Sequence, residues 1–511
     1  MRGLTARIFP PAFWAALLAG AALPFALAPF DYWLLAPASA GALLWVLNRA
    51  LPHSTAMLGW WYGVGKYAAG VSWIYVSIHD YGHATPALAG FLVLLFVAGL
   101  ALFSSLQGWV YGRWLRTARP LADGFAFAAT WTLTEWLLTW VLTGFPWLFI
   151  GYAHIDDPLG ALAPVGGVLL VGFASVFSVA FVVAVLETIG WRKRLVGVTL
   201  ALLPWLVAWP LQSKQWVETG DSGRVALVQS NIGQDIKWRM DSIGMILDRH
   251  RRLTAGHWDN DLVIWPEAAI TIFQRQAVDY LAEMDRRARA GGATLILGVP
   301  AYEISPGAPA SDGVFRNTAV ALGNGEGRYV KQRLVPFGEY VPLAGLLRGV
   351  IEFFNLPMSR TEPGPENQPL LRAGPWGVAM AICYEIVYPD LVRRSAREAD
   401  VLVTISNDSW FGNSTGPLQH VQMARMRARE NGRWVLRATN NGVTAIIDAH
   451  GTVRAELPQF ETGVLEGHFT AMNGTTPFGR YGHLPLLVGL ALILAGTLVR
   501  VVSLRPFFRR T

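Results

Sequence analysis

Hydrophobic positions divide the chain into two kinds of segment. Up to about residue 212, long apolar runs follow one another with short polar breaks, and one more run lies near the C-terminal end. A helix that crosses a bilayer needs about 20 mostly apolar residues. The sequence therefore predicts eight membrane spans, at residues 11–29, 32–48, 56–78, 87–112, 123–142, 160–187, 195–212 and 484–504.

Basic residues lie on every second connection between these runs, and the intervening loops contain no Lys or Arg. The basic positions are Arg2, Arg7, Arg49, Arg113, Arg116, Arg119, Arg192, Lys193, Arg194, Arg500, Arg505, Arg509 and Arg510. Cytoplasmic loops carry an excess of Lys and Arg. The alternation therefore predicts that both termini are cytoplasmic and that the segment between the last two spans lies outside.

The first run also has features of a cleaved signal peptide: a basic start, an apolar centre and small residues at Ala26 and Ala28. Pro29 follows directly and should hinder cleavage, and the charge alternation requires this span. We therefore favour an uncleaved helix.

Two ionisable residues, Lys66 and Glu135, fall inside predicted spans. An ionised group in a membrane is costly and often functional, but it can also simply face the interior of a helix bundle. The sequence leaves both interpretations open.

From Arg224 the pattern changes to short apolar runs separated by polar and helical segments. Six runs indicate strands covered on both faces: residues 224–230, 261–267, 293–299, 376–385, 399–408 and 443–451. Residues 241–253 and 418–434 have helical spacing. Strands interleaved with helices predict an α/β or layered α+β domain. The charged part of the second helical segment, 424–434, is interpreted as a solvated helix face.

Composition supports this division. Apolar residues make up 53% of the chain and charged residues 15%, below the quarter that is usual for soluble proteins. The formal charge of +7 could suggest a nucleic-acid partner, but many of the basic residues lie in short loops between spans, and no nucleic-acid-binding pattern is present. We expect a membrane protein with domains at residues 1–215 (seven spans), 220–478 (soluble) and 482–511 (the last span and a basic tail), and no nucleic-acid partner.

Three predicted strands end in polar chemistry, at Glu267, Cys383 and Asp408, and Cys383 is the single cysteine of the chain. Catalytic groups often follow strand ends, because the sheet is rigid and the loop is open. A cysteine nucleophile needs a base and a positive charge near the developing oxyanion. Glu267 and Lys331 could supply them, although each residue could equally be structural.

The order WPE, K…LVPFGEYVP and ICYE resembles the carbon–nitrogen hydrolase (nitrilase) superfamily. The LVPFGEYVP and NIGQDIKW segments and the seven-plus-one arrangement of spans narrow the resemblance to the apolipoprotein N-acyltransferases, bacterial enzymes that complete lipoprotein maturation. One departure is Ser230–Gly233, where the family pattern is Gly-Asn-Ile-Pro. It leaves the shape of that loop open.

The resemblance implies an αββα sandwich, without metal or cofactor, in which Glu267 is the general base, Lys331 stabilises the oxyanion and Cys383 is acylated. It implies supporting carboxylates at Glu339 and Glu385 and a substrate-entry position at Trp238. The backbone N–H of Tyr384 is a further candidate for the oxyanion. We also expect Phe353 and Phe354 to insert into the membrane as part of a lid, or else to pack on the domain's own core.

The implied reaction moves an acyl chain from a phospholipid, most simply phosphatidylethanolamine, through a Cys thioester to the α-amine of diacylated apolipoproteins, with ping-pong kinetics. The implied location is the bacterial inner membrane, with the catalytic domain in the periplasm. Two alternatives remain: a membrane-anchored amidase or nitrilase that uses the same three residues, and a transporter or scaffold with an inactive domain.

Overall fold

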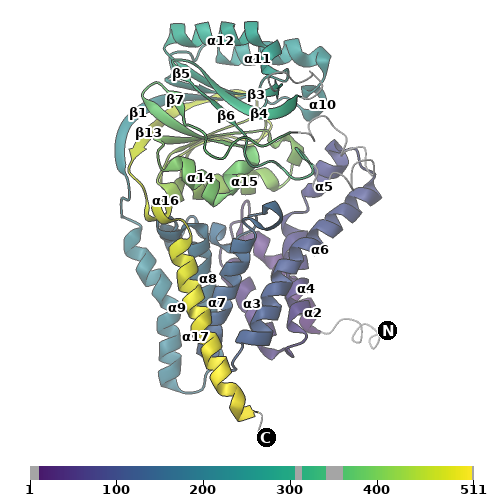
Figure 1. The fold of residues 1–511 in the computed structure, drawn as a ribbon, viewed down its shortest axis with the longest axis vertical. Helices are drawn as coiled ribbons and strands as arrows, with labels where there is room; N and C mark the ends of the chain where they lie inside the picture. Colours follow the sequence, from purple (N-terminus) through teal and green to yellow (C-terminus); the bar gives the residue numbers. More distant parts are fainter. Residues whose placement is uncertain (1–10, 305–312, 341–360, 509–511) are drawn as a thin grey trace. The chain divides into compact units, whose positions relative to one another are not determined.

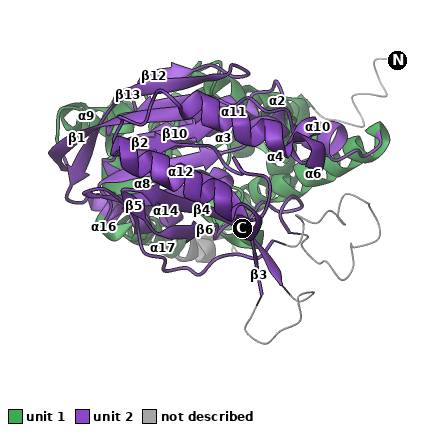
Figure 2. Cartoon of the chain, turned by 90° about the horizontal axis from the view of Figure 1, so that it is seen from above, with its two compact units in different colours: residues 1–75, 86–215, 480–511 green, residues 76–85, 216–479 purple. Residues whose placement is uncertain are grey.

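The computed structural model describes residues 11–304, 313–340 and 361–508, and the chain separates into two compact units (Figure 2). The helical unit comprises residues 1–75, 86–215 and 480–511. The sheet unit comprises residues 76–85 and 216–479.

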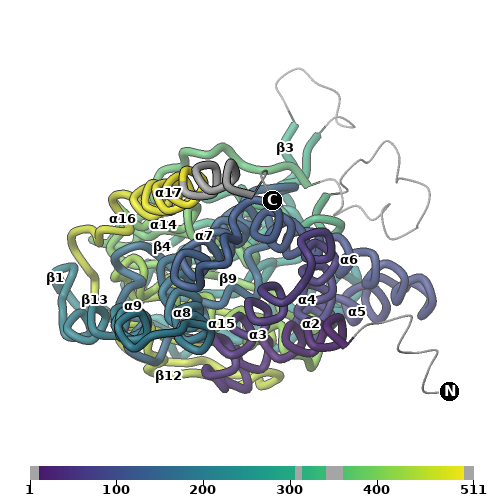
Figure 3. The backbone as a smooth tube through the Cα atoms, turned by 90° about the horizontal axis from the view of Figure 1, so that it is seen from below, coloured from purple at the N-terminus to yellow at the C-terminus, as the bar shows by residue number. Residues whose placement is uncertain are grey.

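The helical unit is built from apolar helices. They are α2 (Pro11–Ala22), α3 (Leu35–Arg49), α4 (Thr55–Gly70), α6 (Pro86–Val110), α7 (Pro120–Leu137), α8 (Ala163–Glu187), α9 (Trp191–Leu211) and α17 (Leu484–Phe508). Although α17 comes from the C-terminal end of the chain, it packs against α7 and α8 (Figure 3). The unit therefore contains segments from both the N-terminal and the C-terminal parts of the sequence.

In the described part of the chain, three helical segments are long and apolar enough to cross a membrane: residues 86–115, 158–187 and 191–211. They agree with three of the predicted spans. Residues 11–26 and 484–499 form shorter apolar helices. The total of eight spans remains a prediction.

The predicted span 56–78 differs from the structure. Helix α4 ends at Gly70, and a short helix α5 (Ile74–Val76) and a π-helical turn (Ser77–Tyr81) follow. This turn belongs to the sheet unit, where the Ser77 hydroxyl donates to the Trp410 carbonyl (2.6 Å) and the Tyr81 ring lies 6.0 Å from that of Trp410. Apolar character alone does not separate a span from a segment that packs on another part of the protein.

Small residues allow α2 and α4 to approach closely. A Cβ atom at Gly20 would overlap the carbonyl oxygen of Tyr62, and one at Gly65 would overlap that of Leu17. Membrane helices associate through such close backbone contacts, because lipid provides no hydrophobic drive for helix association.

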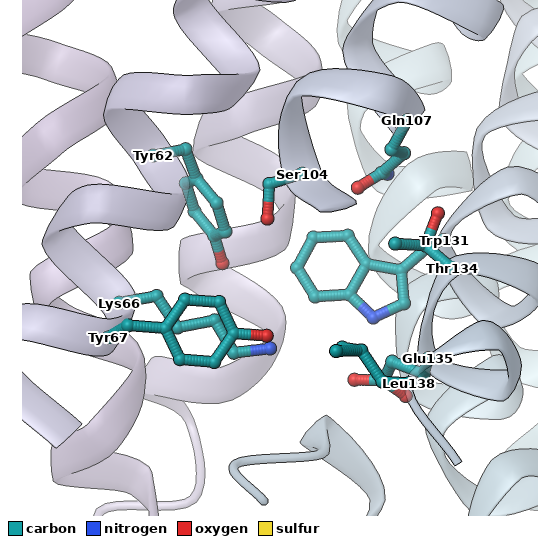
Figure 4. A pocket seen from close by; sticks show the side chains of 9 residues that line it. All are labelled: Tyr62, Lys66, Tyr67, Ser104, Gln107, Trp131, Thr134, Glu135 and Leu138. Carbon is teal, nitrogen blue, oxygen red and sulfur yellow. The ribbon is translucent and has the colours of Figure 1, made fainter. Parts of the chain in front are cut away.

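Lys66 and Glu135, the two ionisable residues inside predicted spans, are both buried and line one pocket of the helical unit (Figure 4). The Lys66 ammonium lies 5.3 Å from the ring centroid of Tyr67 and 5.9 Å from that of Trp131. Glu135 Oε1 accepts the N–H of Ile150 at 3.0 Å. The pocket holds about 10 Å³, too little for a lipid headgroup.

The sheet unit contains two sheets in its described residues. The six-stranded sheet has the order β13 (Gly463–Asn473), β1 (Glu218–Gln229), β2 (Leu262–Ile264), β3 (Thr294–Glu303), β4 (Val314–Gly323) and β6 (Arg328–Val330). The seven-stranded sheet has the order β12 (Val453–Leu457), β11 (Thr444–Ile447), β10 (Val435–Thr439), β9 (Val401–Ser406), β8 (Trp376–Ile382), β7 (Leu371–Ala373) and β5 (Gly325–Glu326).

The two sheets pack face to face and helices cover their outer faces (Figure 1). Apolar side chains of α11 (Ile243–Thr254) and α12 (Val278–Gly291) cover the first sheet, and α14 (Pro389–Ala396) and α15 (Gly416–Asn431) cover the second. Every residue of the parallel strands β8, β9 and β10 is buried, as expected for strands that are covered by a layer on each face. The predicted α/β domain is confirmed, with its layers in the order α, β, β, α.

Candidate functional site

The candidate site lies where several strands of the sheet unit end. Glu267 comes three residues after β2, Lys331 comes directly after β6, and Cys383 comes directly after β8. Asp408 comes two residues after the end of β9. The strands hold the backbone at these points, so the side chains beyond them are positioned by the rigid part of the fold.

The Lys331 ammonium links two carboxylates. Its Nζ lies 3.3 Å from Oε1 of Glu267 and 2.9 Å from Glu339, and its side chain is 1% exposed. Burial alone lowers the pKa of Lys331, but the charges of Glu267 and Glu339 outweigh burial, and the net shift is upward. Lys331 is therefore a permanent cation at the centre of this cluster.

Two asparagines complete the hydrogen bonds of Glu267. The Asn317 side chain on β4 donates to Oε1 of Glu267 (2.7 Å) and to Oε1 of Glu339 (2.9 Å). The backbone N–H of Asn407 donates to Oε2 of Glu267 (2.9 Å). Both carboxylate oxygens of Glu267 are thus held, which fixes the orientation of a candidate base.

Cys383 begins the short helix η12 (Cys383–Val387), in the left-handed backbone region at φ +54°. Burial, followed by the charge of Glu267, raises the pKa of the Cys383 thiol, while the charge of Lys331 and a hydrogen bond with Ser406 oppose this shift. Glu267, Lys331 and Cys383 therefore share one buried environment. The thiol is protonated at rest and needs a base at the moment of attack.

Glu385 joins the segment around Lys331 to the turn that carries Cys383. Its Oε1 accepts the backbone N–H of Gln332 (2.6 Å) and of Arg333 (3.1 Å) and the hydroxyl of Tyr329 (3.0 Å). Its Oε2 accepts the N–H of Ile382 (2.7 Å). Burial raises the pKa of Glu385 to about 7, although the N–H donors oppose this shift. Glu385 thus holds the candidate nucleophile and the candidate cation at a fixed separation.

A second buried cluster, formed by Asp408, His420 and Arg437, contacts the backbone of Cys383. Asp408 Oδ2 accepts Nη2 of Arg437 (2.6 Å), and Oδ1 lies 3.3 Å from Nδ1 of His420. The Nε2 atom of His420 lies 3.1 Å from the Cys383 carbonyl oxygen. The sequence pattern marked Asp408 but not His420 on helix α15 or Arg437 on strand β10, because a basic residue gives no signal until its partner is known.

The interpretation of residues 424–434 as a solvated helix face is wrong. Arg427 and Glu430 on α15 are fully buried and form an ion pair at 2.8 Å. Arg433 is also buried and donates to the carbonyl oxygens of Ala399 (2.6 Å) and Gly474 (2.5 Å). Charged residues are almost never buried unless they are paired. Arg427 pairs within its own helix, whereas the carbonyl partners of Arg433 come from distant parts of the chain.

The loop that departs from the family pattern is held by Asn440. Its Oδ1 accepts the Ser230 hydroxyl (2.8 Å) and the Ile232 N–H (3.1 Å), and its Nδ2 donates to the Asn407 side chain (3.0 Å). Asn231 adopts a left-handed conformation at φ +46°. The loop is thus tied to the residue whose N–H holds Glu267.

The remaining predicted residues differ in placement. Trp238 is 41% exposed and follows the short helix α10 (Gln234–Lys237). Tyr384 is buried, with its ring centroid 5.2 Å from that of Tyr388. Phe353 and Phe354 lie outside the described residues.

Known proteins resemble this chain along nearly its whole length. A family model for the "Apolipoprotein N-acyltransferase N-terminal domain" matches residues 19–182, and a "Carbon-nitrogen hydrolase" model matches residues 224–474. A protein from Pseudomonas aeruginosa named apolipoprotein N-acyltransferase is 47% identical over 506 residues, covering 98% of both chains. Proteins of the same name from Azotobacter vinelandii (48% identical; 94% of this chain and 93% of that one) and Vibrio cholerae (39%; 93% and 95%) are also similar. The matches confirm the resemblance found in the sequence: the chain belongs to the apolipoprotein N-acyltransferase family.

Proposed function

We propose that this protein transfers an acyl chain from a phospholipid to the α-amine of the lipid-modified N-terminal cysteine of apolipoproteins. The name that its relatives carry supports the acceptor. One observation carries the chemistry: Lys331 Nζ lies 3.3 Å from Glu267, and Glu385 ties the segment after Lys331 to the turn that carries Cys383. The phospholipid donor, with phosphatidylethanolamine as the first candidate, follows from the membrane character of the chain.

In the first half-reaction, a carboxylate oxygen of Glu267 takes the thiol proton while the sulfur of Cys383 attacks the sn-1 ester carbonyl. Lys331 and the backbone N–H of Tyr384 stabilise the oxyanion. The C–O bond then breaks, Glu267 returns the proton to the leaving alkoxide, and lysophospholipid departs. A thioester remains on Cys383.

In the second half-reaction, the α-amine of the acceptor attacks the thioester carbonyl and Glu267 takes a proton from the attacking nitrogen. The C–S bond breaks, the amide product leaves, and the proton passes to the sulfur. Donor and acceptor thus use the same site in turn, which gives ping-pong kinetics.

The other predicted residues have supporting roles in this proposal. Glu339 holds Lys331, and Glu385 holds Lys331 and Cys383 in register. Trp238 lies at the substrate entrance, and Phe353 and Phe354 form a membrane-facing lid.

We further propose eight spans, with seven in residues 1–215 and the last in 482–511. Both termini are then on the cytoplasmic side of the bacterial inner membrane, and residues 220–478 form the catalytic domain in the periplasm. The alternation of basic and non-basic loops supports this orientation.

The test of the function is acylation of the purified protein. The wild type is mixed with a phospholipid labelled in its sn-1 chain, and we expect a hydroxylamine-labile label on the protein. A diacylated lipopeptide added next should remove the label and gain it as an amide. Cys383→Ala should take up no label, and label on this variant would refute the assignment of the nucleophile.

The same assay separates the two alternatives. Hydrolysis of small amides without lipid acylation would favour a membrane-anchored amidase. A protein with neither activity would favour a transporter or scaffold with an inactive domain.

A further inference from the structure

A second lysine, Lys237, contacts the backbone of Glu267. Lys237 is the last residue of α10, and its side chain is buried although the next residue, Trp238, is 41% exposed. The Lys237 ammonium donates to the backbone carbonyl of Glu267 at 3.3 Å. None of the roles proposed above uses this lysine.

Charge balance explains why a second cation is useful here. The buried carboxylates of Glu267 and Glu339 share one ammonium, that of Lys331. With Lys331 alone the cluster has a net negative charge, and a thiolate at Cys383 would add another. Like charges in a buried site disfavour ionisation.

The other titratable groups around Glu267 do not supply the missing positive charge. Burial lowers the pKa of His250 on α11 to about 4, so this imidazole is neutral at pH 7. Arg437 is paired with Asp408. Among the described residues, Lys237 is the remaining cation here, and its ammonium contacts the backbone of Glu267 directly.

The position of Lys237 is costly. Burial lowers the pKa of its ammonium to about 8, and the charge of Glu267 only partly offsets this shift. A buried charge that makes one hydrogen bond to a carbonyl contributes little to stability by itself. Its electrostatic effect on Glu267 is the better account of its burial.

We propose that Lys237 is a positioning residue that fixes the backbone of Glu267 and keeps its carboxylate ionised while the thiol of Cys383 loses its proton. This inference rests on the proposed function of Glu267 as the base.

Alkylation of Cys383 by iodoacetamide tests the proposal without any acyl donor, and the single cysteine makes the signal specific. We expect the alkylation rate to decrease as the pH is lowered and Glu267 becomes protonated; we call this decrease the acidic limb of the pH–rate profile. Glu267→Gln should abolish the acidic limb. Lys237→Gln keeps a donor for the Glu267 carbonyl but removes the charge. It should move the acidic limb to higher pH by about one unit or more, since a carboxylate without its cation is protonated more easily.

Two further variants serve as controls. Arg239→Gln removes an exposed charge two residues away and should leave the limb in place. Lys237→Arg keeps the positive charge beside Glu267 and should therefore keep the wild-type acidic limb.

The proposal would be overturned if the acidic limb lay at the same pH in the wild type and in Lys237→Gln. A Lys237→Gln variant that unfolds more easily but keeps the wild-type limb would also overturn it, because the lysine would then be purely structural. If Lys237→Gln does not fold, Lys237→Arg decides instead: an acidic limb displaced from that of the wild type, although the charge is retained, would overturn the proposal. Failure of the wild type to take up an acyl chain would count against the proposed function alone, because the alkylation limb still reports on Lys237.

Discussion

At the scale of single residues, the buried carboxylates of the site differ in what surrounds them. Glu385 accepts three backbone N–H groups and one hydroxyl, while Glu267 accepts one amide side chain, one backbone N–H and one ammonium. A carboxylate held mainly by backbone acts as a structural tie. One held by an ammonium next to a thiol can exchange a proton with that thiol.

Replacement of Glu385 by Gln should therefore impair both stability and acylation. A glutamine amide presents a donor to at least one of the N–H groups that the carboxylate now accepts, and a buried unsatisfied group costs about 1–3 kcal/mol. Thermal unfolding in detergent and the rate of acyl-enzyme formation measure the two effects. Exposed Glu362→Gln is a matched control, and unchanged values in Glu385→Gln would contradict the tie.

Asp408 gives a pH dependence of stability. Burial raises the pKa of Asp408, but Arg437 and His420 outweigh burial, and the net shift is downward. A carboxyl whose pKa is lower in the folded state stabilises the fold above its ordinary value of about 4 and loses that contribution as the pH falls below it. Apparent melting temperatures across this range should fall towards acid in the wild type.

In Asp408→Asn, the melting temperature should be lower at neutral pH and should change less as the pH falls. The same slope in both proteins would show that other groups control the acid sensitivity.

At the scale of elements, polar side chains join helices and strands that are distant in sequence. Strand β10 carries the buried Arg437, which pairs with Asp408 after β9, and Arg427 on helix α15 donates to the carbonyl oxygen of Val387 in η12. In the helical unit, the pocket that contains Lys66 and Glu135 joins α4 to α7. Each such contact fixes the register between two elements at the cost of desolvating charges.

Lys66 and Glu135 line the same buried pocket with opposite formal charges. We expect Lys66→Met and Glu135→Gln each to lower the apparent melting temperature, because each leaves a buried charge without its counterpart, at a cost of about 3 kcal/mol or more. The double variant should be more stable than the sum of the single changes implies. Strictly additive losses would show that the two groups act independently.

At the scale of the whole molecule, residues 76–85 lie in sequence between two segments of the helical unit but belong to the sheet unit. Within the sheet unit, Ser77 and Tyr81 contact Trp410, which follows Asn407 and Asp408 closely along the chain. The sheet unit is therefore assembled from two separate stretches of sequence, and the shorter one packs near the loop that holds Glu267.

The proposed orientation predicts which loops are accessible from outside the cell membrane. In a Cys383→Ala background, Ser213→Cys and His53→Cys each place one thiol at an exposed position. A membrane-impermeant maleimide added to spheroplasts should label Ser213→Cys and spare His53→Cys until the membrane is opened. Labelling of His53→Cys alone would reverse the orientation.

The amino-acid pattern by itself was sufficient for several features. Continuous apolar runs predicted β8 and β9, because strands between two layers have no polar face, and the polar residues that end them marked Cys383 and Asp408. Residue order and motif wording indicated the family. These properties are local or linear, so no knowledge of long-range contacts was needed.

Other features were decided by the tertiary structure. Strand β10 was missed because Arg437 interrupts its apolar pattern, and only the distant Asp408 makes that arginine acceptable in the core. The same reason hid the burial of Arg433, the tie formed by Glu385 and the contact of Lys237 with the backbone of Glu267. A charge in a sequence looks solvated until its partner is known, and the partner is brought to it only when the chain folds.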